Sequence, residues 1–314
     1  CAINQDLKAL IFERGIDSDF LLYWVISNAK TIQNLGSGTT VSGIRLETLN
    51  ALRLNLPPSA EQIRIVAKLE ELLSDLDAGV AELKVAQKKL TQYRQSLFKA
   101  AVEGALTAEW RAERAKRGEP LETGAQLLER ILAERRRRWE EKQLAKFKEQ
   151  GKTPPKDWQD KYPEPVKPNT ADLPELPKGW VWATIDQLAI EMKYGSSAKT
   201  SVEIDGIPVL RMGNIQDGEL DIQDLKFLPA DHNEFPSLIL QDGDLLFNRT
   251  NSPELVGKTA IYRSQIAPCS YASYLIAVRF SPSFISEFAS AYINSIYGRL
   301  WVKSVVTQQV GQAN

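Results

Sequence analysis

The stretch LPPSAEQIRIVAKLEELLSDLDAGVAELKVAQKKLTQYRQSL, residues 56–97, carries leucines at a strict interval of seven residues. The repeated positions are Leu69, Leu76, Leu83, Leu90 and Leu97. An apolar residue at every seventh position predicts a helix that supercoils against another helix with the same repeat. A helix over about residues 60–103 would be roughly 65 Å long at 1.5 Å per residue.

The apolar seam of this helix also uses residues between the leucines. We predict that the pairing residues are Leu69, Leu72, Leu76, Leu83, Ala86, Leu90, Tyr93 and Leu97. Nothing else in the 314 residues repeats the pattern, so the chain itself supplies no obvious partner helix. A long amphipathic helix that lies on a domain is the alternative. Ser59 and Gln62, just after two prolines, predict a capping box at the start of the helix.

Composition narrows the class of protein. A length of 314 residues suits two or three domains, and 43% hydrophobic with 25% charged residues is typical of a soluble chain. No apolar run approaches the roughly 20 residues of a membrane span, and we see no signal peptide. Two cysteines and one histidine argue against a disulfide framework and a zinc site. We therefore expect a cytoplasmic protein without a metal or a membrane partner, and Cys1 in place of methionine suggests a fragment or a processed chain.

The chain changes character along its length. Residues 105–176 are charged, with a second helix expected around 122–150 and then an extended strap, because seven prolines lie between 154 and 177. Within that helix, residues 135–138 are four arginines, which favours a solvated helix face over contacts with DNA phosphates. From Trp180 onward, short apolar runs separated by Gly, Asp, Asn and Pro predict strands. The expected fold is α+β: a globular domain with a mixed or antiparallel sheet, joined to a long helix of coiled-coil type.

Sequence signals for catalysis are weak. ELVGKTAI (254–261) contains the Gly-Lys-Thr of a phosphate-binding loop, but Ser252 stands where the first glycine belongs, and a strand is expected to follow. No glycine-rich cofactor cradle follows a predicted strand. His232 stands alone, which favours a structural role. The sequence predicts neither a catalytic residue nor a metal ligand.

An internal repeat is the most informative signal. A shift of 268 residues aligns the start of the chain on its end without gaps for about thirty positions. The matched pairs include Cys1 with Cys269, Leu7 with Leu275, Ala9 with Ala277, Phe12 with Phe280, Phe20 with Phe288 and Ser27 with Ser295. The chain then begins late in one repeat and ends late in the next. A further Pro-Pro and heptad helix is expected after Asn314, and that helix is the natural partner of the leucine seam.

Three segments in order resemble one known family. LNLPPSAEQIRIVAKLEELL (54–73), RQSLFKAAVEGALTAEWR (94–111) and LPKGWVWATIDQLA (176–189) are similar to the specificity subunit of type I restriction–modification enzymes. IPVLRMGNIQDGELD (207–221) and DGDLLFNRTNSPELVGKTAIY (242–262) resemble that family's second target-recognition domain. The resemblance covers essentially the whole chain.

The resemblance implies a division into four parts. Residues 1–55 would be the C-terminal part of a first target-recognition domain and 56–104 the long conserved spacer helix. Residues 105–176 would be the charged helical and proline-rich connector. Residues 177–314 would be a second target-recognition domain, truncated at its C-terminal end.

The resemblance also implies function and partners. Each target-recognition domain would read one half of a bipartite duplex DNA site, and the chain would be a non-catalytic scaffold for methyltransferase subunits and, through the complex, restriction subunits. S-adenosylmethionine, Mg and ATP are expected on those partners, and no cofactor on this chain. Because the seam lacks its partner, we expect a homodimer through the long helix, with the helix folded back on residues 122–150 as the weaker alternative.

Base edges are read by donors and acceptors such as arginine, asparagine and glutamine. Such side chains are expected on turns of the second domain, with Arg249 and Asn251 favoured. The predicted DNA-binding residues are Lys193, Tyr194, Ser196, Lys199, Arg211, Asn214, Asn248, Arg249, Thr250, Asn251, Lys258, Gln308 and Gln309. The alternative for any one of them is a turn residue bonded to backbone. Two other functions compete: a coiled-coil adaptor whose globular domain binds protein, and a nuclease or methyltransferase without its catalytic part.

Overall fold

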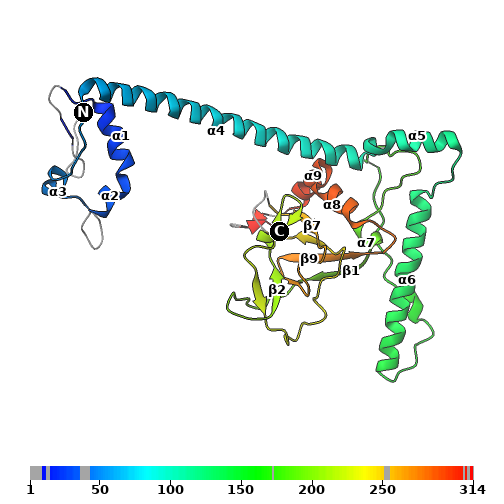
Figure 1. Cartoon of the computed structure of the whole chain (residues 1–314). Coiled ribbons are helices and arrows are strands. Elements are labelled where there is room, and N and C mark those ends of the chain that lie inside the picture. The colour runs from blue at the N-terminus through cyan, green and yellow to red at the C-terminus, as the bar shows by residue number, and fades with distance from the viewer. Residues whose placement is uncertain are drawn as a thin grey trace. The chain divides into compact units, whose positions relative to one another are not determined.

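A computed structural model describes residues 9–11, 15–35, 43–171, 173–250 and 255–306, with the backbone of 308–309 and 312–313. The chain divides into two compact units, Cys1–Leu90 and Thr91–Asn314. Figure 1 labels the helices and strands along the chain. Among the described residues, no helix is long and apolar enough to cross a membrane.

The first unit ties short helices to the start of a long one. Its elements are α1 (Ser18–Ser27), α2 (Ala29–Asn34), α3 (Leu46–Asn50) and the first part of α4 (Ser59–Val102). The Gln62 side chain is 1% exposed. Its Oε1 accepts from the Asp17 N–H at 2.8 Å, and its Nε2 donates to the carbonyls of Pro57 at 2.8 Å and Gly15 at 3.3 Å. The first turn of α4 is thereby fastened to the residues that precede α1.

The capping box predicted at Ser59 and Gln62 is wrong. Ser59 is already the first residue of α4, and the Gln62 N–H bonds to the carbonyl of Pro58 at 3.0 Å. The Gln62 amide is used instead for the contacts to Gly15 and Asp17, which come from 45 or more residues away in the chain. Local sequence pattern could not distinguish these two uses of one side chain.

Helix α4 confirms the long helix expected over about 60–103. Its 44 residues span about 66 Å at 1.5 Å per residue. Most of the predicted pairing residues are exposed in the chain by itself: Leu76 is 61%, Leu83 71% and Leu90 68% exposed. Leu72, Ala86, Tyr93 and Leu97 are also exposed, and Leu69 is half-buried. The pairing of this seam with another helix stays a prediction.

The second unit begins with helices. They are η1 (Ala105–Thr107), α5 (Ala108–Arg117), α6 (Gly124–Glu149), η2 (Trp158–Lys161) and α7 (Ile185–Leu188). Helix α6 confirms the second helix expected around 122–150. Thr123 caps it in a capping box with Gln126: the Thr123 Oγ1 accepts the Gln126 N–H, and the Gln126 side chain accepts the Thr123 N–H.

The arginine run lies on α6 and is paired. Arg136, Arg137 and Arg138 form ion pairs with glutamates four residues away, and the Arg137–Glu141 distance is 2.7 Å. Arg135 instead contacts the strap and α7. Its guanidinium donates to the Tyr162 hydroxyl at 2.8 Å and the Pro163 carbonyl at 3.1 Å in the strap, and it pairs with Asp186 of α7 at 3.2 Å. The positive charge of the run is thus largely matched within this unit.

Aromatic rings hold the proline-rich strap on α6. Trp158 stacks on Trp139 with ring centroids 5.8 Å apart, and Tyr162 meets Trp139 edge-on at 5.4 Å. Such pairs stabilise by about 0.5–1.5 kcal/mol beyond area burial. These ring contacts hold the strap against α6 by side-chain packing.

The strands form two main sheets, which confirms the mixed and antiparallel pairing expected. The antiparallel sheet has the order β1-β9-β6-β7 and the mixed sheet the order β5-β2-β8. Their bounds are β1 (Ala189–Tyr194), β9 (Leu275–Phe280), β6 (Leu245–Asn248), β7 (Thr259–Ile261), β5 (Lys226–Leu228), β2 (Ile207–Leu210) and β8 (Ser270–Tyr271). A short hairpin joins β3 (Ile215–Gln216) to β4 (Glu219–Leu220).

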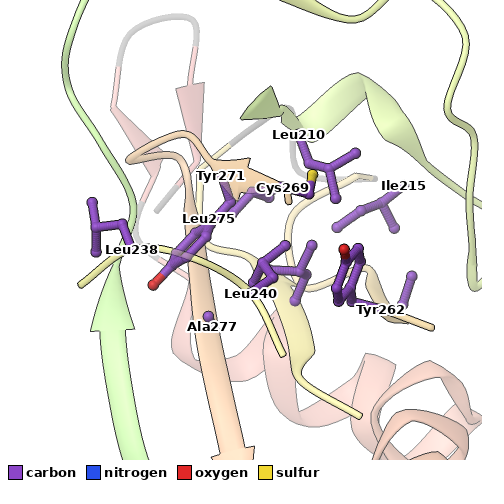
Figure 2. Packing of buried hydrophobic residues seen from close by; sticks show 11 residues of the cluster. Leu210, Ile215, Leu238, Leu240, Tyr262, Cys269, Tyr271, Leu275 and Ala277 are labelled. Carbon is purple, nitrogen blue, oxygen red and sulfur yellow. The ribbon is translucent and has the colours of Figure 1, made fainter. Parts of the chain in front are cut away.

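The core lies between these two sheets. Its buried residues are Leu210, Ile215, Leu238, Leu240, Leu246, Ala260, Tyr262, Cys269, Tyr271, Leu275 and Ala277, most of them labelled in Figure 2. Successive side chains of a strand point to opposite faces. Val278 and Phe280 of β9 therefore pack on the other face, with Ala289 of α8. Burial raises the pKa of the Cys269 thiol to about 12, so this side chain behaves as an apolar core residue.

Helices at the end of the chain match those at its start. Helix α8 (Ser286–Asn294) begins 268 residues after α1, and α9 (Ile296–Val305) follows it as α2 follows α1. At the break between helices, the Ser27 hydroxyl donates to the Trp24 carbonyl at 2.9 Å. Ser295 donates to the Tyr292 carbonyl in the same way at 2.6 Å. The element boundaries agree with the internal repeat in the sequence. Strands β10 (Gln308–Gln309) and β11 (Gln312–Ala313) pair beyond α9.

Candidate nucleic-acid interface

A cavity of about 950 Å³, lined mainly by polar residue types, opens at one edge of the second unit. It is lined by residues 196–200, 211–216, 221–226, 248, 255–258 and 272–274 in part or in full. Six predicted DNA-binding residues meet in its wall: Ser196, Lys199, Arg211, Asn214, Asn248 and Lys258. They lie up to 62 residues apart in sequence, so the fold gathers them.

Strand topology explains this convergence. Strands β1 and β6 both run antiparallel to β9, with Tyr194 opposite Ile276 and Asn248 opposite Leu275. Both strands therefore end where β9 begins. Strand β2 runs parallel to β8, so its end at Leu210 lies beside Tyr271. A side chain at Gly195 would clash with the carbonyls of Tyr271 and Ala272, and only glycine allows this approach.

Three buried polar side chains hold the cavity wall. The Asn214 carboxamide accepts from the Arg211 N–H at 2.8 Å and donates to the carbonyls of Asp221 at 2.8 Å and Gln223 at 3.1 Å. The Ser196 hydroxyl donates to Glu234. The Asn248 Nδ2 donates to the Leu255 carbonyl at 3.3 Å. These contacts correspond to the alternative of turn residues bonded within the protein, and none of them tests a contact with DNA.

Two buried polar atoms in this wall have no hydrogen-bond partner among the residues that the structure describes. They are the Asn248 Oδ1 and the Arg211 Nε, although another nitrogen of Arg211 donates to the Asp224 carbonyl. An unsatisfied buried polar group costs about 1–3 kcal/mol. Such atoms are rare in folded proteins and are often completed by water or a ligand.

Three lysines line the cavity, together with Arg211 and the carboxylates Asp221 and Asp224. The lysines are Lys199, Lys226 and Lys258. Among the residues that the structure describes, none of the three forms an ion pair or a side-chain hydrogen bond. Lys226 lies in β5 and was not predicted from the sequence, since nothing local distinguishes it from other lysines in strands. The sequence also gave no indication of Gln216 and Gln223, which line the same cavity.

Arg249 and Tyr194 form a separate contact beside the cavity. The Arg249 guanidinium lies over the Tyr194 ring, with its Cζ 5.0 Å from the ring centroid. The Arg249 N–H donates to the Tyr274 carbonyl at 3.0 Å. The end of β1 thus supplies the ring and the residue after β6 supplies the cation, although the two residues are 55 positions apart in sequence.

The other predicted residues differ in their surroundings. Lys193 is paired with Glu191 at 2.9 Å and donates to the Ser237 carbonyl, while Thr250 is buried. Asn251 and the side chains of Gln308 and Gln309 lie outside the described residues. The His232 Nδ1 lies 3.5 Å from a carboxylate oxygen of Glu234, the residue that accepts from the Ser196 hydroxyl. No group of three or more potential metal ligands occurs in the described part of the chain.

An ion-pair network, in which only Asp244 is fully buried, links the strands behind this edge. Arg279 of β9 contacts Asp244 at 2.7 Å and Glu191 at 3.3 Å. The hydrogen bond to Asp244 raises the pKa of the Arg279 guanidinium. Partial burial acts to raise the pKa of Glu191, but the hydrogen bond from Lys193 and the neighbouring positive charges outweigh it, so that pKa lies below its usual value.

Comparison with known proteins finds similarity to one group of DNA-recognition subunits. The model of the type I restriction modification DNA specificity domain matches residues 1–84. The specificity subunit of EcoKI from Escherichia coli K12 is 24% identical over 99% of this chain and 55% of its own length. The StySPI specificity subunit of Salmonella potsdam is 21% identical over the same shares of both chains.

The chain is thus similar to the specificity subunits of type I restriction–modification enzymes. It spans about half the length of these curated relatives. A solved structure from work on the assembly and conformational transition of a type I R-M system is 18% identical, with a TM-score of 0.46 over 93% of this chain and 55% of that one. The HsdS subunit from Thermoanaerobacter tengcongensis is 19% identical, with a TM-score of 0.36 over 94% of this chain and 56% of that one.

Proposed function

We propose that this chain is a DNA-recognition subunit whose second unit reads one half of a bipartite duplex site. The observation that carries the proposal is the convergence of three strand ends on a cavity lined by lysines 199, 226 and 258, which have no ion-pair partner among the described residues. Cationic side chains bind DNA phosphates and displace the counterions that are condensed on the DNA. Base edges require polar groups held at fixed positions, and the buried side chains of this wall fix the loops that would carry them.

Recognition without catalysis is part of the proposal. Methyltransferase subunits would bind the chain as a scaffold and carry S-adenosylmethionine, and restriction subunits would join with Mg and ATP. Such partners would also supply phosphate contacts, which is consistent with a net charge of −1 on this chain. The cytoplasm, where DNA is accessible, is the compartment that this function requires.

The α4 seam is proposed as a pairing surface. Leu76, Leu83 and Leu90 are more than half exposed, and fully burying one leucine stabilises by roughly 1.5–3 kcal/mol. For the 314-residue chain by itself, a second copy provides a helix with the same repeat. We therefore infer a homodimer through α4.

The test of DNA recognition is the salt dependence of binding. The chain with its methyltransferase subunits is titrated with duplex DNA at several salt concentrations, as wild type and as Lys199→Gln/Lys226→Gln/Lys258→Gln. Each lost phosphate contact should lower the slope of log affinity against log salt by roughly 0.9. Lys146→Gln/Lys148→Gln in the last turn of α6 is the matched control and should leave the slope unchanged.

Two results would contradict the proposal. An unchanged slope in the triple variant would remove the three cavity lysines from the DNA-binding surface. Absence of duplex binding by the wild-type assembly would reject DNA recognition altogether and favour the coiled-coil adaptor.

A further inference from the structure

We propose that Arg249 reads a guanine in the half-site, and that Tyr194 is the positioning residue that holds the Arg249 guanidinium for this contact. The inference rests on the proposed DNA recognition and deepens it, because it names the base that one side chain selects. The Tyr194 ring holds the Arg249 guanidinium in place, and the guanidinium nitrogens have no hydrogen-bond partner among the described residues.

The Arg249 side chain is fixed on one side. Its residue follows directly after β6, and its N–H is bonded to the Tyr274 carbonyl at 3.0 Å. Tyr194, the last residue of β1, lies under the guanidinium at 5.0 Å from Cζ to ring centroid. Both strands pair with β9, so the ring and the cation come from a rigid part of the sheet. A cation over an aromatic face is attracted to it and loses rotational freedom.

In the described part of the chain, the hydrogen-bonding edge of this arginine has no partner. Within the described ranges, no side-chain hydrogen bond or ion pair involves the Arg249 guanidinium. Other arginines of the same unit are engaged: Arg279 binds Asp244, and Arg135 binds Asp186. Tyr194 is 61% exposed, so the contact lies at the surface, where a partner can reach it.

This combination suits guanine. A guanidinium presents parallel N–H groups in a rigid plane, and stacking leaves those groups free. Guanine offers two acceptors, O6 and N7, side by side in the major groove. Adenine replaces O6 by an amino group, which would oppose the arginine donors. A phosphate also accepts two such hydrogen bonds, but that contact would carry no preference between bases.

Selection from randomised duplexes separates these outcomes. The full chain with its methyltransferase subunits should enrich duplexes with an invariant G·C pair at one position or more. Arg249→Ala should reduce the preference at one of these positions by roughly 5- to 150-fold and leave the other positions unchanged. Arg249→Lys should also lose the preference, because lysine lacks the planar fork. Arg137→Ala on α6 is the control for removal of a surface arginine.

The role of Tyr194 has its own readout. Tyr194→Phe keeps the ring and should keep the base preference, while Tyr194→Ala should weaken discrimination at the position that Arg249 serves and nowhere else. A purely structural role of the ring would instead lower binding to all duplexes equally. Equal profiles for Tyr194→Phe and Tyr194→Ala would overturn the positioning role.

A modified base identifies the contacted atom. Replacement of the selected guanine by 7-deazaguanine removes N7 and should weaken wild-type binding, while Arg249→Ala should bind both duplexes equally. The same replacement at a neighbouring guanine is the control. If Arg249→Ala lowers affinity but leaves every base preference intact, the residue binds phosphate and the inference is wrong. If the wild-type assembly selects no sequence, the proposed recognition itself fails, and guanine reading fails with it.

Discussion

Ser196, Asn214 and Asn248 show how single residues shape the candidate interface. All three are at least 95% buried and bond to groups within the protein. A DNA contact from this wall must therefore come from their more accessible neighbours, such as Lys199 and Lys258. The polar residues inside fix the loops, and the lysines that line the cavity remain available.

Glu191 provides a pH-dependent contribution at the residue scale. Its carboxylate lies 2.9 Å from the Lys193 Nζ and 3.3 Å from the Arg279 Nη1, and its pKa lies below the ordinary value of 4.5. A carboxyl group whose pKa is lower in the folded state stabilises the fold above its unfolded pKa, and this stabilisation is lost as pH falls through the folded pKa.

The corresponding variant is Glu191→Gln. It should lower the free energy of unfolding at pH 7, and the difference from wild type should shrink as the pH falls below about 4.5. Urea denaturation at a series of pH values measures this difference. Glu175→Gln, at an exposed position, is the control. A difference that stays constant from pH 7 to pH 3 would show that the charge of Glu191 does not stabilise the fold.

At the scale of elements, α4 combines a regular helix with an irregular anchor. Its length and seam follow a repeat of seven residues, but its attachment to the residues before α1 depends on one buried amide, that of Gln62. Removal of this amide leaves the Asp17 N–H and two carbonyls without their partner. Gly15 is exposed and Asp17 and Pro57 are half-buried, so water offsets part of the roughly 1–3 kcal/mol that a fully buried unsatisfied group would cost.

We therefore expect Gln62→Ala to release the segment before α1 without unfolding α4. Hydrogen exchange should become faster at the amide of Asp17 and at the first amides of α1, while protection in the middle of α4 stays the same. Gln92→Ala, at an exposed position of α4, should change neither. Equal exchange in Gln62→Ala and wild type would mean that other contacts hold this segment.

At the scale of the whole molecule, the question is what covers the α4 seam. Leu83 is 71% exposed and lies midway between Leu69 and Leu97. If two copies pair through α4, a lysine at this position would place a charge in the interface, at a cost that the remaining leucines cannot offset.

Leu83→Lys should accordingly convert a homodimer into a monomer while the helical content of each chain stays the same. Sedimentation at tens of micromolar compares the masses, and circular dichroism checks the folding. Lys84→Ala, one residue away and off the seam, should remain dimeric. A wild-type chain that sediments as a monomer under these conditions would contradict the homodimer.

The sequence by itself determined the features that repeat along the chain. The seven-residue leucine interval gave α4 to within one residue at each end, and the change from helical to short apolar runs gave an α+β second unit. The order of motifs also indicated a resemblance to type I specificity subunits, and the EcoKI subunit is 24% identical over 99% of the chain. Periodic patterns of this kind are readable because each residue's role depends on its near neighbours.

Only the tertiary structure decided which polar side chains remain available at the candidate interface. Asn214 and Lys258 were equally good candidates in sequence, but Asn214 is 4% exposed and bonded three times within its own loop, while Lys258 lines the open cavity. The pairing of β5 with β2 brings Lys226 to the same cavity. Tyr194 contacts Arg249 because β1 and β6 both pair with β9. Pairing between distant strands sets these contacts, and the register of distant strands is not encoded in any local stretch of residues.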